Sequence, residues 1–159
     1  MSKTLVAYFS ASGVTRKAAE NLKTAVDGDI YEIKPEIPYT TEDLNWMNPK
    51  ARSTIEMEDK SSRPAIIPDE LDVSAYDLIF LGFPIWWYVA PTVINTFLES
   101  HDFSGKKIVL FATSGGSGFG RTVEFLKKSV PDAQFTRGGL LNEDTSVEFL
   151  KKWAATLHL

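Results

Sequence analysis

Residues 4–15, TLVAYFSASGVT, contain the change of pattern that decides the fold. The first six form a continuous apolar run with β-branched and aromatic members, which is typical of a strand buried on both faces of a parallel sheet. A short polar loop containing Gly13 follows, and apolar residues then recur at helical spacing at positions 14, 18, 22 and 25. A buried strand that leads directly into an amphipathic helix indicates a βα unit.

The rest of the chain repeats this unit, and the polarity of the strands predicts their order. Three strands are continuous apolar runs, whereas the second and fifth are more polar and suit the edges of a sheet. We therefore expect an α/β fold, a doubly wound, five-stranded parallel sheet in the order 2-1-3-4-5 with helices on both faces, as in flavodoxin-like folds. The expected strands are residues 4–9, 29–33, 77–82, 106–113 and 133–136, and the helices after the first are 92–99, 121–130 and 145–157.

Composition excludes several classes of protein. The 159 residues fit one domain, 1–159, and the absence of Cys excludes a disulfide framework and a thiolate nucleophile. Two His residues make a histidine-rich metal site unexpected. With 17 Lys+Arg against 21 Asp+Glu, the net charge of −4 argues against a nucleic-acid partner. No apolar stretch has the length of a membrane span, so we expect a cytoplasmic protein.

Residues 34–70 form an irregular insertion between the second and third strands. They hold five of the eight Pro residues, and we expect short helices at 41–46 and 49–59, the second with Asn48 as N-cap and Pro49 in its first turn. The acidic residues at 56–59 are expected on a solvated helix face. The apolar side chains expected to pack against the rest of the protein are Trp46, Met47, Ile55 and Met57.

Three loops of unusual composition follow the first, third and fourth strands. In an open α/β sheet, ligands bind outside the carboxyl ends of the strands where the strand order reverses. For the order 2-1-3-4-5 this point lies between the first and third strands. Residues 10–15, 83–91 and 113–120 should therefore meet around one site.

The first loop, SASGVT, is suited to a phosphate. Ser10, Ser12 and Thr15 offer hydroxyl groups, Gly13 permits a close backbone approach, and a helix N-terminus follows. The loop has no Lys or Arg and does not match the P-loop pattern, which favours a phosphate monoester over a triphosphate with magnesium. The alternative is that Ser12 only caps the helix.

The second loop, FPIWWYVAP, places four aromatic residues at the end of a buried strand. This density of rings indicates a platform for a flat ligand, and the alternative is a core or dimer contact. The third loop, TSGGSGFG, has four Gly in six positions, so its backbone can lie against a ligand. It matches neither the dinucleotide fingerprint nor a nucleophile elbow, and the alternative is a loop without a ligand.

Together these loops resemble the flavodoxin family, and the closest likeness is to bacterial flavodoxin-like proteins with an insertion after the second strand. The resemblance covers nearly the whole chain and implies non-covalent FMN as the cofactor. For the FMN phosphate it implies Ser10, Ser12, Gly13, Val14 and Thr15. For the isoalloxazine ring it implies Pro84, Ile85, Trp86, Trp87 and Tyr88. For the pyrimidine side of the ring it implies Thr113, Ser114, Gly115, Gly116, Gly118 and Phe119.

Two features depart from the family. Relatives with this PIWW stretch commonly have Gly where Tyr88 stands, and the charge of −4 is mild beside the strongly acidic surface of electron-carrier flavodoxins. We expect an electron carrier that serves redox partner proteins. The alternatives are an FMN-dependent NAD(P)H:quinone-type oxidoreductase with a small-molecule acceptor, and a non-redox module that binds another phosphate ester. No metal ligand and no catalytic side chain is assigned, and the oligomeric state stays open.

Overall fold

The strands of the computed structural model form one parallel sheet. They are β1 (Thr4–Tyr8), β2 (Asp29–Glu32), β3 (Leu78–Pro84), β4 (Lys107–Thr113) and β5 (Gln134–Leu140). They follow one another across the sheet in the order β2-β1-β3-β4-β5, so the predicted fold class is confirmed. The structure describes residues 3–11, 13–45, 47–67, 71–86, 89–113, 122–141 and 146–157.

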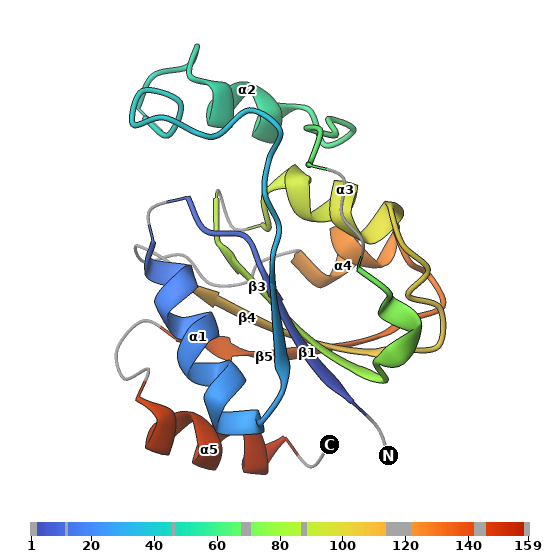
Figure 1. Ribbon diagram of the computed structural model, residues 1–159. Helices are drawn as coiled ribbons and strands as arrows, with labels where there is room; N and C mark the ends of the chain where they lie inside the picture. Colours follow the sequence, from blue (N-terminus) through green and yellow to red (C-terminus); the bar gives the residue numbers. More distant parts are fainter. Residues whose placement is uncertain are drawn as a thin grey trace.

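Helices cover both faces of this sheet (Figure 1). The helices of the chain are α1 (Val14–Val26), α2 (Arg52–Glu58), α3 (Thr92–Glu99), α4 (Thr122–Lys127) and α5 (Val147–Thr156), with a 3₁₀ turn, η1, at Val73–Ala75; α2 belongs to the insertion and covers neither face. Helices α1 and α5 pack on one face, and α3 and α4 pack on the other. Within the described ranges, no helix combines the length and the apolar character needed to cross a membrane.

The two faces of the sheet explain why its central strands read as unbroken apolar runs. Successive side chains of a strand point to opposite faces. In β1, Leu5 and Ala7 belong to the core under α3 and α4, whereas Val6 and Tyr8 belong to the core under α1 and α5. Because both faces are covered, every position of the strand must be apolar or nearly so.

Strand β5 is longer than the sequence pattern predicted. It continues through Gly138 and Gly139, where a side chain would collide with its surroundings: a Cβ at Gly138 would lie 2.4 Å from the carbonyl oxygen of Leu110, and one at Gly139 3.0 Å from Trp153. The pairing register also shifts between Leu110 and Phe111. These two glycines let Trp153 of α5 pack closely on the strand. They also interrupt the alternation of apolar and polar residues by which a strand is recognised in a sequence.

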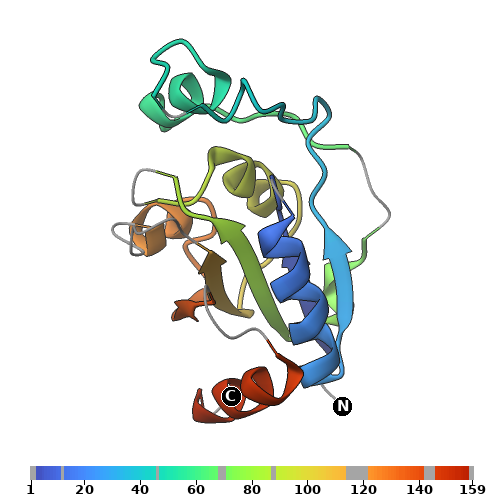
Figure 2. The same ribbon diagram turned by 90° about the vertical axis from the view of Figure 1, so that its left-hand side faces the viewer.

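The insertion leaves the sheet and returns to it through a narrow neck. Pro35 and Ile66 form an antiparallel bridge, in which the Glu36 amide donates to the Ala65 carbonyl and the Ile67 amide to the Lys34 carbonyl, both at 2.8 Å. Figures 1 and 2 show the chain beyond this neck, with α2, outside the carboxyl-terminal edge of the sheet. The insertion is therefore placed at the edge where the loops after β1 and β3 begin.

Two predictions within the insertion are wrong in detail. Residues 41–44 form turns rather than a helix, and the side chains of Thr40 and Asp43 bond to each other's backbone amides across these turns. Helix α2 begins at Arg52 rather than at Pro49. The Asn48 side chain accepts from the Lys50 amide and its carbonyl from the Ala51 amide, so Asn48 forms a turn instead of capping a helix.

The apolar side chains of the insertion are also only partly buried. Met57 is buried as predicted, but Met47 is 75% exposed and Ile55 is 54% exposed, so the packing prediction is wrong for these two. Trp46 lies outside the described residues.

Candidate functional site

Helix α1 begins at a left-handed glycine directly after the loop that follows β1. Gly13 has φ +95°, and its amide donates to the Ser10 hydroxyl at 2.9 Å. The first intrahelical bond runs from the Lys17 amide to the Gly13 carbonyl. The amides before Lys17 have no acceptor within the helix, and together with the helix dipole they favour an anion at this end.

Arg16, in the first turn of α1, is already paired with a carboxylate. The Arg16 guanidinium donates to the Glu32 carboxylate at 2.5 Å and so ties the helix to the neighbouring strand β2. An anion beside Ser10 and residues 13–15 would therefore meet amides and hydroxyl groups, and the phosphate site stays a prediction.

Thr15 and Thr113 join the start of α1 to the end of β4. Their hydroxyl oxygens lie 2.8 Å apart, and the two residues are 1% and 5% exposed. Thr113 pairs with Pro84 in the register of β3 and β4, and its carbonyl accepts from the Ile85 amide at 2.9 Å. The structure thus brings predicted site residues from all three loops together at the point where the strand order reverses.

This contact changes the part that Thr15 is expected to play. The sequence assigned its hydroxyl to a phosphate, whereas in the structure that hydroxyl faces Thr113 in a buried position. A hydroxyl can donate and accept at once, so Thr15 keeps one further hydrogen-bonding capacity when Thr113 is its partner. Thr15 acts first as a link between two of the loops.

An aromatic cluster, formed by Phe9, Tyr39 and Trp86, lies beside this junction. The Trp86 ring meets Phe9 edge-on at a centroid distance of 5.9 Å and Tyr39 at 5.3 Å, and Phe9 and Tyr39 are 5.5 Å apart. Phe9 follows β1, Trp86 follows β3, and Tyr39 comes from the insertion. Edge-to-face contacts of this kind fix the orientation of each ring, so the insertion helps to orient Trp86.

Tyr39 is itself held by an ion pair from α2. The Arg52 guanidinium lies 3.8 Å from the centre of the Tyr39 ring and binds Glu56 at 2.9 Å. The Tyr39 hydroxyl donates to the other carboxylate oxygen of Glu56, and Arg52 also donates to the Ile37 carbonyl at 2.6 Å. Burial, with the hydrogen bond to Glu56 as a second cause, raises the pKa of Tyr39, which keeps the hydroxyl protonated.

Sequence reasoning missed Tyr39, Arg52 and Glu56 as parts of this region. Glu56 was expected on a solvated helix face, but it accepts from both of the other side chains. The available signal was an aromatic residue between Pro38 and Thr40, in a segment expected to be irregular.

Of the sixteen predicted site residues, half are described, and these lie in or beside the junction. Ser10, Gly13, Val14 and Thr15 surround the start of α1, and Pro84, Ile85, Trp86 and Thr113 follow β3 and β4. The predictions for the others fall outside the described residues: Ser12, Trp87, Tyr88, Ser114, Gly115, Gly116, Gly118 and Phe119.

Comparison with known proteins gives this geometry a context. Two candidate flavoproteins of known structure, from Bacteroides eggerthii and Bacteroides uniformis, are each 47% identical to this chain, with TM-scores of 0.92 and 0.91. The first alignment covers 100% of this chain and 99% of the relative, and the second covers 97% and 98%. A flavoprotein from Lactobacillus acidophilus, solved in complex with FMN, is 26% identical with a TM-score of 0.71 over 97% of this chain and 99% of its own.

The search of curated proteins found no match to this sequence. The family model described as flavodoxin, in contrast, matches residues 3–157, which is almost the entire chain. Since the match runs through β1, β3, β4 and the loops that meet at Thr113, the protein belongs to the flavodoxin family.

Proposed function

We propose that this protein binds FMN at the junction of its three loops and transfers electrons. The observation that carries the proposal is the junction itself. The Thr15–Thr113 contact and the bond from Ile85 to Thr113 bring the amino end of α1 and the Trp86 platform to the same reversal of strand order. The relative from Lactobacillus acidophilus that was solved with FMN supports the choice of cofactor.

The residues present fit the two ends of this cofactor. Ser10, Gly13, Val14 and Thr15 at the start of α1 would hold the phosphate with amides and hydroxyl groups and without a charged side chain. Pro84, Ile85 and Trp86 would hold the flat ring, and Phe9 and Tyr39 contact Trp86. The other eight predicted residues remain predictions.

FMN supplies the redox chemistry when it is bound, and the protein binds, orients and shields it. The first turn of α1 stabilises the phosphate dianion, and the aromatic cluster holds Trp86 in one orientation. The protein thus serves as a carrier that exchanges electrons with redox partner proteins. Its net charge of −4 is small, so electrostatic attraction guides the approach of these partners only modestly. A cytoplasmic location stays a prediction.

The insertion favours a second candidate function, that of an FMN-dependent oxidoreductase. Tyr39 packs on Trp86, and α2 lies beyond the carboxyl-terminal edge of the sheet, so this segment lies beside the proposed ring position. From there its side chains would contact a small acceptor, such as a quinone, that approaches the ring.

The visible absorption spectrum of the purified protein is the first test. We expect a bound flavin that is released on denaturation and identified as FMN, and saturable uptake of FMN by the stripped protein. Colourless protein that takes up no FMN contradicts the proposal. Steady NAD(P)H oxidation with a quinone by the isolated protein supports the oxidoreductase, whereas reduction only through a separate flavoprotein reductase supports the carrier.

A further inference from the structure

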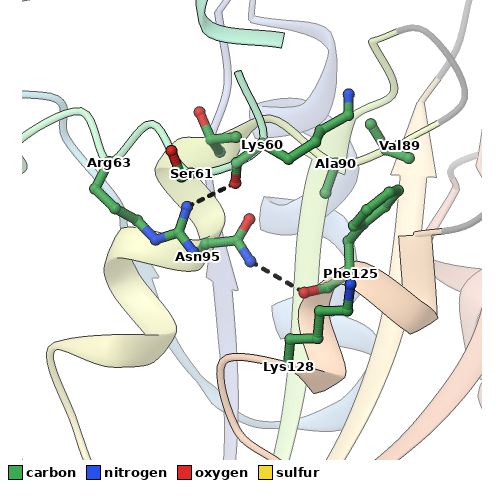
Figure 3. A pocket seen from close by; sticks show the side chains of 9 residues that line it. Lys60, Ser61, Arg63, Val89, Ala90, Asn95, Phe125 and Lys128 are labelled. Carbon is green, nitrogen blue, oxygen red and sulfur yellow. Dashed lines mark hydrogen bonds between the residues drawn. The ribbon is translucent and has the colours of Figure 1, made fainter. Parts of the chain in front are cut away.

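A cavity of about 270 Å³ lies between α3, α4 and the chain that follows α2 (Figure 3). Val89 and Ala90 form part of its wall from the loop after β3, and the first turn of α3 contributes Thr92 and Asn95. Its volume is just below the range of roughly 300–1,000 Å³ that accepts drug-sized ligands. The cavity therefore suits a small molecule with about one ring.

Among the described residues, the charged side chains that line this cavity are all cations. They are Lys60, Arg63 and Lys128, and no carboxylate of the described ranges joins them, although the chain as a whole carries a net charge of −4. Arg63 is neutralised by Glu99, whose two carboxylate oxygens each lie 3.0 Å from its Nε. In the part of the chain that the structure describes, neither lysine forms an ion pair.

One aromatic ring separates the two lysines. The Lys60 Nζ lies 5.7 Å from the centroid of the Phe125 ring and the Lys128 Nζ lies 5.3 Å from it. Figure 3 shows Phe125 beside the cavity, between the side chains of Lys60 and Lys128. Phe125, Val89 and Ala90 thus offer an apolar surface, with an ammonium group on either side of it.

The walls of the cavity are held in place by hydrogen bonds. The Asn95 amide nitrogen donates to the Phe125 carbonyl at 3.3 Å and to the Ser129 hydroxyl at 2.9 Å, which joins α3 to the chain around α4. The Lys60 ammonium donates to the Met57 carbonyl at 2.6 Å, and partial burial lowers its pKa. A lysine whose charge is poorly solvated gains from an anion beside it.

We propose that this cavity binds a small organic acid, with one carboxylate or phosphate group held by Lys60 on one side of the Phe125 ring or by Lys128 on the other, and a single flat apolar group laid against Phe125. The amino end of α3 adds the positive end of its dipole on the same side. This proposal goes beyond the FMN site, because only the wall at Val89 and Ala90 belongs to a loop that the cofactor is expected to touch.

Val89 also connects the cavity to the aromatic cluster. The backbones of Val89 and Trp86 exchange two hydrogen bonds, of 3.0 and 3.1 Å. A ligand in contact with Val89 therefore touches a residue whose backbone is hydrogen-bonded to that of Trp86. The acid would be a second ligand beside the cofactor.

Titration of the ¹⁵N-labelled protein with benzoate, followed by NMR, tests the proposal. We expect saturable shifts of the amides around Lys60, Thr92 and Asn95, and weaker binding at higher ionic strength. Benzamide, which has the same ring without the charge, is the neutral control, and phenyl phosphate tests whether a phosphate is preferred to a carboxylate. Equal binding of benzoate and benzamide, or shifts confined to other regions, would overturn the proposal.

Variants then test the two lysines. Lys60→Met and Lys128→Met keep the apolar stem, and the variant that removes the lysine bound to the acid should weaken benzoate binding about tenfold, as expected for the loss of one charge-assisted hydrogen bond. Lys151→Met on the exposed face of α5 is the matched control and should bind benzoate unchanged. Unchanged affinity in both cavity variants contradicts the proposal.

The same samples separate this proposal from that of the FMN site. Flavin absorbance shows whether benzoate displaces the cofactor, and NMR shows where it binds. A protein that binds no FMN but shows saturable, lysine-dependent shifts at the cavity refutes the proposed function alone. A protein that binds FMN but shows no such shifts refutes the cavity proposal alone.

Discussion

The hydroxyl groups of Thr15 and Thr113 lie 2.8 Å apart, although 98 positions separate the two residues in the sequence. One follows the start of α1 and the other ends β4, so this buried contact joins two of the loops assigned to the proposed cofactor. Removing one hydroxyl leaves the other buried without its partner, which costs more than removing both.

Thr15→Val and Thr113→Val should therefore each lower the free energy of unfolding by about 1–3 kcal/mol. The double variant should lose less than the sum of the two, because no unpaired hydroxyl remains. Urea denaturation of all four proteins measures this coupling. Strictly additive losses would show that the two hydroxyl groups do not depend on each other.

Gly13→Ala tests the start of α1. A Cβ at Gly13 would meet nothing within 4 Å, so the substitution causes no collision. Its effect comes from the backbone strain of an alanine at φ +95°, which should lower the free energy of unfolding by about 1–2 kcal/mol. We also expect FMN affinity to fall, because relief of the strain moves the amides that hold the phosphate.

Gly105→Ala is the matched control for this variant. Gly105 has φ +75° and equally free surroundings, but it lies at the opposite end of the sheet, just before β4. It should lose comparable stability and keep its FMN affinity. If both variants lose FMN equally, the effect at Gly13 is one of general stability.

Tyr39 links the insertion to Trp86 in two separable ways. Tyr39→Phe removes the bond to Glu56 and should cost about 1.5–3 kcal/mol, while the ring contact with Trp86 remains. Tyr39→Ala removes both and should cost about 3–5 kcal/mol. The tryptophan bands of the near-ultraviolet circular dichroism spectrum should change only in the alanine variant, since only there does Trp86 lose a neighbouring ring. Equal stability of the two variants would contradict a role for the ring.

Tyr76 predicts how the protein responds to alkaline pH. A hydrogen bond to Asp29, of 2.7 Å, together with partial burial raises the pKa of Tyr76 from 10.0 to about 12. A raised pKa means that the folded state holds the proton more tightly, so its contribution is complete below pH 10 and is lost as the pH rises through about 12. Stability should fall less steeply over this window in Tyr76→Phe. Parallel curves for the two proteins, from urea denaturation at each pH, would contradict this.

The parts that could be predicted from the sequence are those governed by short-range patterns. Strands β1, β3 and β4 are covered on both faces, so their residues form continuous apolar runs that can be recognised in the sequence. Helix α3 has the predicted bounds. The order of the strands followed from the polarity of the two edge strands. The junction of the loops followed from that order.

The insertion could not be predicted in the same way, because its contacts join residues that no local pattern relates. Glu56 meets Tyr39 across 17 positions, and the Tyr39 ring meets Trp86 of another loop. In β5, a side chain at Gly138 or Gly139 would collide with Trp153, which comes later in the chain. In each case the partner that explains the residue is distant in sequence.

The neck at Pro35 and Ile66 makes the insertion structurally separable from the sheet. Its two ends are already side by side, so lengthening or replacing the chain between them adds little loop-closure entropy and leaves the strand pairings untouched. Natural variation or laboratory grafting can therefore exchange this segment as a cassette while the βα scaffold stays the same. Differences among such proteins in the electron acceptors that they use should therefore arise mainly from the chain between Pro35 and Ile66.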